Sequence, residues 1–260
     1  MPESDRTSAA ARPHLDRDEP YWRASTRPLA SLVFLLPLIV AYEAGSFIQL
    51  SDPERHAIGS IKAERLLHSI FEIFGVVGLA LPAILLVTVL LVWHVLENRP
   101  WRVRGTVIAR MAVESLAWTL PLFVLAGLAS LLGSSTSQLA AQDGGDSFQG
   151  LSMGWRLWIA VGAGLYEEFL FRMIGVALVH SLMVDLFGVK ERLGRVVAVG
   201  VTAGAFAWYH APAEVWLFVY YAMAGAFFGV LYLGRGFGIT AGAHAFFDIL
   251  VLVVLKGQDF

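Results

Sequence analysis

The chain has 260 residues, of which 57% are hydrophobic and 15% charged, whereas a soluble globular domain carries about 25% charged residues. The net charge of −2 gives no indication of a nucleic-acid partner. The absence of cysteine excludes disulfide bonds, cysteine metal sites and a cysteine nucleophile. These values predict an integral membrane protein that is surrounded by lipids.

Apolar runs follow one another along the chain and are long enough to cross a bilayer, which takes about 20 apolar residues. We therefore expect an all-α fold, a polytopic transmembrane helical bundle with about seven spans. The spans are predicted over residues 29–49, 73–96, 107–132, 156–183, 195–211, 215–234 and 237–256.

The regions between and around these spans differ in composition. Residues 1–28 are polar and charged, which predicts a flexible N-terminal tail. N-terminal transmembrane helices are expected over 29–133, with an amphipathic interfacial helix at 54–72. A polar loop at 134–155 then leads into a C-terminal membrane core at 156–256.

Basic residues indicate how the bundle is oriented, because Lys and Arg are enriched in cytoplasmic connections. The tail and the connections 97–110 and 184–195 are rich in Arg and Lys, whereas residues 133–155 contain neither. The N-terminus is therefore predicted on the cytoplasmic side, in a bacterial cytoplasmic membrane. The basic residues of 54–72 are the exception, since they would lie on the outer side.

The fourth predicted span contains ionisable side chains, which are costly inside a bilayer and mark functional sites. Glu168 and Arg172 are four residues apart with the acid first, which favours an ion pair on one helix face. Glu167 is rotated by about 100° from Glu168 and so projects toward another helix. One carboxylate is thus neutralised, and the other is left for chemistry. The alternative is a polar clamp that joins two helices.

Two later spans carry further polar groups of the catalytic type. His210 ends the fifth span, four residues after Phe206. His244 and Asp248 have the same spacing, so both project from one face of the seventh span. Each group alone is compatible with packing or with a simple His–Asp hydrogen bond. Their occurrence on three helices favours one shared site, because polar residues in spans face the bundle interior.

These residue types predict a choice of chemistries. A carboxylate with a histidine can deprotonate water, and a second histidine can donate a hydrogen bond to an oxyanion, which together describe amide hydrolysis. Alternatively, Glu167, His210 and His244 would bind Zn²⁺ with water in the open position. A different class of function is a proton-coupled carrier, or a non-catalytic membrane scaffold, that uses the same buried groups.

The motifs together resemble the CPBP family, the CAAX-prenyl-protease and bacteriocin-processing (Abi-type) intramembrane proteases. The resemblance covers residues 150–252, and so makes 156–256 the expected catalytic core. It rests on three motifs in order, Glu167-Glu168-x-x-x-Arg172, Phe206-x-x-x-His210 and His244-x-x-x-Asp248. Glu168, Arg172 and Phe206 take supporting positions in these motifs.

The resemblance implies a role for each catalytic residue. Glu167 would be the general base that activates water, and His210 would orient that water. His244 and Asp248 would stabilise the oxyanion or align the substrate carbonyl. The implied activity is an intramembrane endopeptidase without a cofactor, with Zn²⁺ as the alternative. Its substrate would be a peptide or membrane protein, lipidated or membrane-associated.

Asp248 departs from the pattern of the prenyl-protein proteases, which have Asn at this position. An ionised Asp accepts hydrogen bonds and donates none. We therefore expect Asp248 either to be protonated or to act by orienting His244.

The depth of the catalytic groups sets a further condition on the fold. Glu167 and His210 lie about 22–24 Å from the cytoplasmic ends of their predicted helices, but His244 only about 12 Å from its own. The three groups can meet only if helices tilt, if the predicted ends of the spans are displaced, or if the glycine-rich connection 235–238 enters the bundle.

Overall fold

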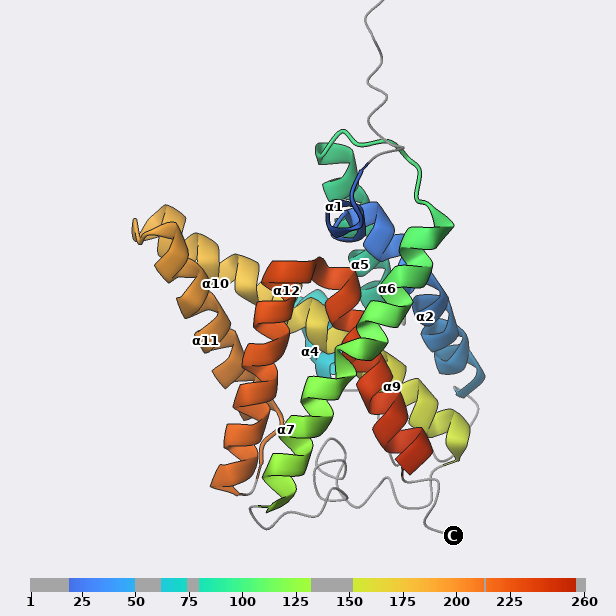
Figure 1. Ribbon diagram of the computed structural model, residues 1–260, viewed down its shortest axis with the longest axis vertical. Helices are drawn as coiled ribbons and strands as arrows, with labels where there is room; N and C mark the ends of the chain where they lie inside the picture. Colours follow the sequence, from blue (N-terminus) through green and yellow to red (C-terminus); the bar gives the residue numbers. More distant parts are fainter. Residues whose placement is uncertain (1–18, 50–61, 74–79, 132–151, 213, 256–260) are drawn as a thin grey trace, which may run out of the picture.

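The computed structural model describes residues 19–49, 62–73, 80–131, 152–212 and 214–255, and all their regular structure is helical (Figure 1). The α-helices are α1 Tyr21–Ser25, α2 Pro28–Gln49, α4 Lys62–Ile73, α5 Leu81–Leu96, α6 Gly105–Ala117, α7 Thr119–Leu131, α9 Met153–Glu168, α10 Ala177–Ser181, α11 Glu191–Tyr209 and α12 Val215–Ile249. Wider, π-helical turns continue three of them, namely η2 Phe169–Val176, η3 Leu182–Leu186 and η4 Leu250–Leu255.

Among the described residues, four helical stretches are long and apolar enough to cross a membrane: Pro28–Ile48, Gly105–Ala129, Met153–Leu186 and Val215–Leu252. The prediction of an all-α membrane protein is therefore confirmed, whereas the count of about seven spans is not. The last two predicted spans, 215–234 and 237–256, correspond to the two helical parts of α12, which meet without a loop at a kink at Gly236. Helix α5 is shorter than a span, and α11 begins with charged residues.

The bend in α12 is made at Gly236, whose φ of 77° and ψ of 176° are not helical. Glycine adopts a positive φ without the clash that a Cβ would cause. In Figure 1 the chain rises through the first part of α12, turns at the top and descends through the second part. Arg235 and Phe237 are buried at this turn. The connection 235–238 therefore lies inside the bundle, which meets the condition set by the depth of His244.

A buried cluster holds this turn against the start of the chain. The Arg235 guanidinium donates to both carboxylate oxygens of Glu114 on α6, at 2.6 and 2.8 Å, and to Ser25 Oγ at 2.8 Å. It also lies 4.3 Å from the ring of Trp22. Tyr21 donates a hydrogen bond to Glu114. Burial, reinforced by that carboxylate, raises the pKa of Tyr21 to about 12 and keeps its hydroxyl protonated.

This cluster corrects the predicted flexible tail at 1–28. Helix α1 lies within that range, and its Ala24 and Ser25 are buried. Because the segment is mostly polar, its composition did not predict that the aromatic rings of Tyr21 and Trp22 would pack on Arg235. Residues 1–18 of the predicted tail lie outside the described residues.

The two other predicted polar segments are described only in part. Within 54–72, helix α4 buries Ala63 and Leu67 and exposes Arg65 and Leu66, as an amphipathic helix does. Of the loop predicted at 134–155, residues 134–151 lie outside the described part. Its last residues already belong to α9, which Ser152 caps by accepting from the Trp155 amide.

Helices α9 and α12 pack closely at Gly164, on the turn of α9 that precedes the acidic motif. A Cβ there would come within 2.6 Å of the Cα and Cβ of Ala245. We expect Gly164→Ala to lower the free energy of unfolding by about 1–3 kcal/mol, because the helices must separate. Gly200→Ala is the control, since its Cβ meets no described atom within 4 Å. Equal melting temperatures of the two purified variants in detergent would contradict this packing.

Candidate active site

The structure brings every residue of the three motifs to one buried site. Helix α9 and the π-helical turn η2 carry the acidic motif, α11 ends at the second motif, and the descending part of α12 carries the third. Each of these residues is at most 8% exposed: Glu167, Glu168, Arg172, Phe206, His210, His244 and Asp248.

The carboxylate of Glu167 faces two histidines. Its Oε2 lies 3.8 Å from His210 Nε2 and 4.0 Å from His244 Nε2. Its Oε1 accepts a hydrogen bond of 3.2 Å from the hydroxyl of Tyr209. Glu167 therefore points toward α11 and α12, as its rotation from Glu168 predicted.

Both histidines present Nε2 to the site, because Nδ1 of each is engaged elsewhere. His210 Nδ1 lies 2.7 Å from the Phe206 carbonyl oxygen, which can only accept, so this nitrogen carries the proton. His244 Nδ1 lies 2.8 Å from Glu168 Oε1. The two imidazoles are thus oriented by partners on the side away from Glu167.

Aromatic rings also hold the two imidazoles in place. His210 stacks on Tyr221 with ring centroids 4.1 Å apart, and His244 stacks on Phe228 at 4.6 Å. Both aromatic residues come from the rising part of α12. Stacking of this kind restricts rotation of the imidazole about its Cβ–Cγ bond.

Glu168 and Arg172 form the ion pair predicted from their spacing, with Arg172 Nε 3.1 Å from Glu168 Oε2 and both side chains fully buried. The guanidinium also lies 4.7 Å from the ring of Phe206, a cation–π contact. Glu168 therefore has two partners, since its other oxygen accepts from His244. Glu168, whose spacing predicted only a partner on its own helix, therefore also links α9 to α12.

Asp248 lies beside His244 on the same helix face, with Oδ2 3.5 Å from His244 Nε2. The carboxyl group is therefore adjacent to the nitrogen that faces Glu167. At this position Asp248 can either be protonated or orient His244, the two alternatives expected from the sequence.

Sequence reasoning missed three residues of the site: Tyr209, Tyr221 and Phe228. The only signal for Tyr209 was its place next to His210, in an aromatic run that is equally typical of a membrane interface. Tyr221 and Phe228 had no signal, because a buried aromatic residue on an apolar helix is usually a packing residue.

The alternative zinc ligands Glu167, His210 and His244 are spread slightly wider than zinc requires. In the described part of the chain, no group of three or more His, Cys, Asp or Glu side chains meets the geometry of a metal site. Zinc ligands lie about 2.0–2.2 Å from the ion, so two ligand atoms of a tetrahedral site lie about 3.4 Å apart. The distances from Glu167 Oε2 are 3.8 Å to His210 Nε2 and 4.0 Å to His244 Nε2, so small side-chain movements would bring these donors to zinc.

Comparison with known protein families agrees with the geometry. Residues 149–250 match the family model described as "Rce1-like: Type II CAAX prenyl endopeptidase Rce1-like". No curated protein and no solved structure is significantly similar to the chain. The match contains all three motifs and nearly coincides with the predicted range 150–252. The resemblance seen in the motifs is thus confirmed: residues 149–250 are similar to the type II CAAX prenyl endopeptidases, which supports a CPBP family intramembrane protease.

Proposed function

We propose that this protein is an intramembrane endopeptidase that hydrolyses a peptide bond of a membrane-associated or lipidated protein or peptide. The observation that carries the proposal is the approach of Glu167 Oε2 to the Nε2 atoms of His210 and His244, at 3.8 and 4.0 Å. These separations are too long for direct hydrogen bonds. They suit a water molecule that bridges the groups.

Glu167 and His210 have the atoms needed to activate that water. Neutral His210 carries its proton on Nδ1, so Nε2 offers a lone pair toward the site. Water that donates one hydrogen to Glu167 and one to His210 keeps a lone pair for attack on the substrate carbonyl carbon. Glu167 takes the proton as the C–O bond forms and then transfers it to the leaving amine as the C–N bond breaks.

His244 and Asp248 stabilise the tetrahedral intermediate in this mechanism. His244 donates Nδ1–H to Glu168, so it can donate from Nε2 to an oxyanion only as an imidazolium. The carboxylates of Glu167, Glu168 and Asp248 lie within 4.0 Å of the ring and balance its charge. Asp248 therefore acts by supporting a protonated His244, and an Asp serves where related proteases have Asn.

The experiment that tests the function is cleavage of a quenched fluorescent peptide library, including lipidated peptides, by the purified protein in detergent. We expect cleavage by the wild type at a rate that a chelator does not change. Loss of cleavage with chelator and its recovery with Zn²⁺ would instead support a metal site at Glu167, His210 and His244. Absence of cleavage together with pH-dependent substrate flux in proteoliposomes would support the carrier.

Tyr209 offers a finer test of the same site. Tyr209→Phe removes the hydrogen bond to Glu167 and keeps the ring, which contacts Phe171 and His210. We expect kcat to fall about tenfold, with KM and the melting temperature little changed, because one hydrogen bond to a charged group is lost. Tyr232→Phe is the control, since its hydroxyl has no hydrogen-bond partner among the described residues. A change in KM or stability alone would contradict a positioning role for Tyr209.

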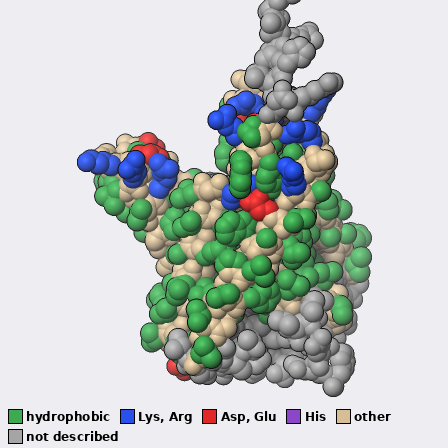
Figure 2. All heavy atoms as spheres, in the orientation of Figure 1, with side chains coloured by type: hydrophobic (Ala, Val, Ile, Leu, Met, Phe, Trp, Pro, Cys, Tyr) green, Lys and Arg blue, Asp and Glu red, His purple; other side chains and the backbone are tan. Residues whose placement is uncertain are grey.

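The charge distribution supports a cytoplasmic N-terminus. Figure 2 shows the Lys and Arg side chains of this face gathered at one end of the molecule, around α1 and at the tip of the α10–α11 arm. Cytoplasmic surfaces of membrane proteins are enriched in these residues. We therefore place α1, the turn of α12 and both basic connections on the cytoplasmic side.

A further inference from the structure

The turn of α12 carries a second buried network of polar side chains, apart from the motif residues. Arg235 lies at the turn and donates two hydrogen bonds to Glu114, through Nε and Nη2. The same guanidinium donates to Ser25 Oγ and to the carbonyl oxygen of Trp22. Glu114 also accepts from the Tyr21 hydroxyl. We call these five residues the Arg235 cluster; they join α1, α6 and α12.

The descending part of α12 is hydrogen-bonded to other helices near this turn and then again at His244. Gly238 N–H donates to Ser31 Oγ on α2 at 3.1 Å, and Ser115 Oγ on α6 donates to the Ile239 carbonyl oxygen at 3.3 Å. Between Ile239 and His244, no side chain makes a hydrogen bond to another helix within the described part of the chain. Hydrogen bonds depend steeply on distance and angle, so the contacts at the turn fix how deep this part lies in the bundle.

A short, regular helix connects the turn to His244. The eight residues from Gly236 to His244 span about 12 Å of helix, and a helix transmits a shift or rotation at one end to the other. At the site, His244 Nδ1 lies 2.8 Å from Glu168 Oε1, and Nε2 lies 4.0 Å from Glu167 Oε2. Misplacement of a reacting group by about 1 Å lowers a rate by up to about 100-fold. The position of the turn therefore affects the geometry of the site.

We propose, on the basis of the proposed function, that Arg235 together with Glu114 positions His244 by setting its depth and rotation. Gly236 gives the turn no fixed angle of its own, because glycine adopts positive and negative φ about equally readily. The direction of the descending part is therefore set by the contacts that hold the turn. Arg235 is buried, and its two parallel bonds to the Glu114 carboxylate fix orientation as well as distance.

The test is peptide cleavage and hydrogen exchange of the purified full-length protein in detergent, with Arg235→Gln, Glu114→Gln and the double variant. We expect kcat to fall about 10-fold to 100-fold in each single variant with KM little changed. The double variant should be no slower than the single ones, because both act through one cluster. Amides of residues 237–249 should exchange faster than in the wild type. Arg235→Lys keeps the charge without the planar fork and should recover part of kcat.

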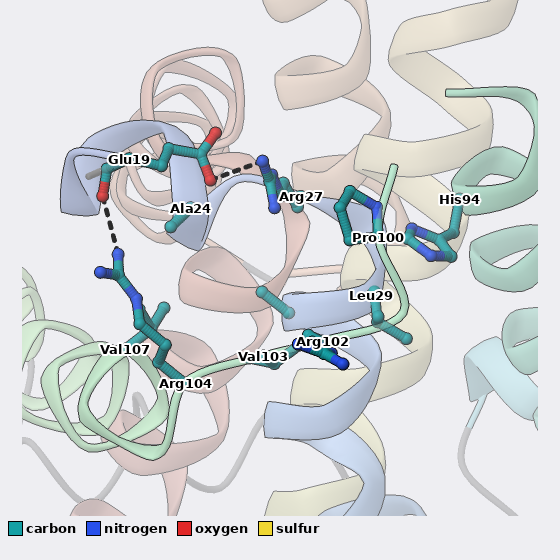
Figure 3. Close-up of a pocket in the computed structure, with 11 residues that line it drawn as sticks. Glu19, Ala24, Arg27, Leu29, His94, Pro100, Arg102, Val103, Arg104 and Val107 are labelled. Carbon is teal, nitrogen blue, oxygen red and sulfur yellow. Dashed lines mark hydrogen bonds and ion pairs between the residues drawn. The ribbon is translucent and has the colours of Figure 1, made fainter. Parts of the chain in front are cut away.

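Arg27→Gln is the matched control. Arg27 pairs with Glu19 at 2.6 Å, and neither residue belongs to α12 (Figure 3). This variant breaks an ion pair at the same end of the molecule and should keep the wild-type kcat and the wild-type exchange at 237–249. A wild-type kcat in Arg235→Gln, or an equal fall in Arg27→Gln, would overturn the positioning role. If the wild type cleaves no peptide, the proposed function fails, and unchanged exchange at 237–249 in Arg235→Gln would separately overturn the effect of the cluster on α12.

Discussion

Glu167→Gln is expected to lower kcat for peptide cleavage by about 10²–10⁴-fold, the contribution typical of a general base. The amide keeps the size of the side chain and can still accept from Tyr209, but it cannot take a proton from water. KM should change little, because the binding surface is preserved. The measurement is the initial rate of the purified variant on a peptide that the wild type cleaves, with kcat and KM determined separately.

The stability of Glu167→Gln distinguishes a catalytic role of Glu167 from the alternative of a polar clamp that joins two helices. A buried neutral amide is less costly than a buried carboxylate, so the melting temperature of Glu167→Gln should not fall. Glu191→Gln makes the same chemical change on an exposed side chain at the start of α11 and should keep full activity. Wild-type rates in Glu167→Gln, or a large loss of stability with activity retained, would favour the clamp.

The second large effect, a loss of stability, is expected when the Glu168–Arg172 ion pair is broken. Both side chains are fully buried, so Glu168→Met leaves the Arg172 charge unpaired and Arg172→Met leaves Glu168 with His244 alone. We expect Glu168→Met to cost about 3–5 kcal/mol of unfolding free energy and Arg172→Met somewhat less. The double variant Glu168→Met/Arg172→Met should recover much of the loss seen in Glu168→Met, because neither charge of the pair remains. Unfolding of each variant in detergent, combined as a double-mutant cycle, gives the coupling energy.

The double variant Glu168→Met/Arg172→Met should regain stability without regaining activity. Cleavage should remain low when stability recovers, because His244 Nδ1 loses the Glu168 oxygen that orients the ring. The matched control is the exposed pair Glu191 and Arg195, which has the same spacing on α11. Its double-mutant cycle should give less than about 1 kcal/mol. Recovery of full activity with stability would show that Glu168 serves only as a partner of Arg172.

The amino-acid sequence by itself determined the features that depend on local periodicity. Runs of apolar residues predicted an all-α membrane protein, and four-residue spacing placed Glu168 with Arg172 and His244 with Asp248 on common helix faces. The same reasoning directed Glu167 away from Arg172 and predicted that the 235–238 connection could enter the bundle. These inferences held because a helix sets the direction of each side chain relative to its near neighbours.

Only the tertiary structure decided how the helices stand relative to one another. The hydrogen bond from His244 to Glu168 joins α12 to α9, and the contact of Tyr209 with Glu167 joins α11 to α9. Both depend on the rotation and depth of whole helices, which close contacts such as Gly164 against Ala245 set. The packing of α1 on Arg235 likewise joins segments far apart in the sequence. Periodicity within one helix carries no information on such contacts, because they arise from the complementary shapes and charges of two surfaces.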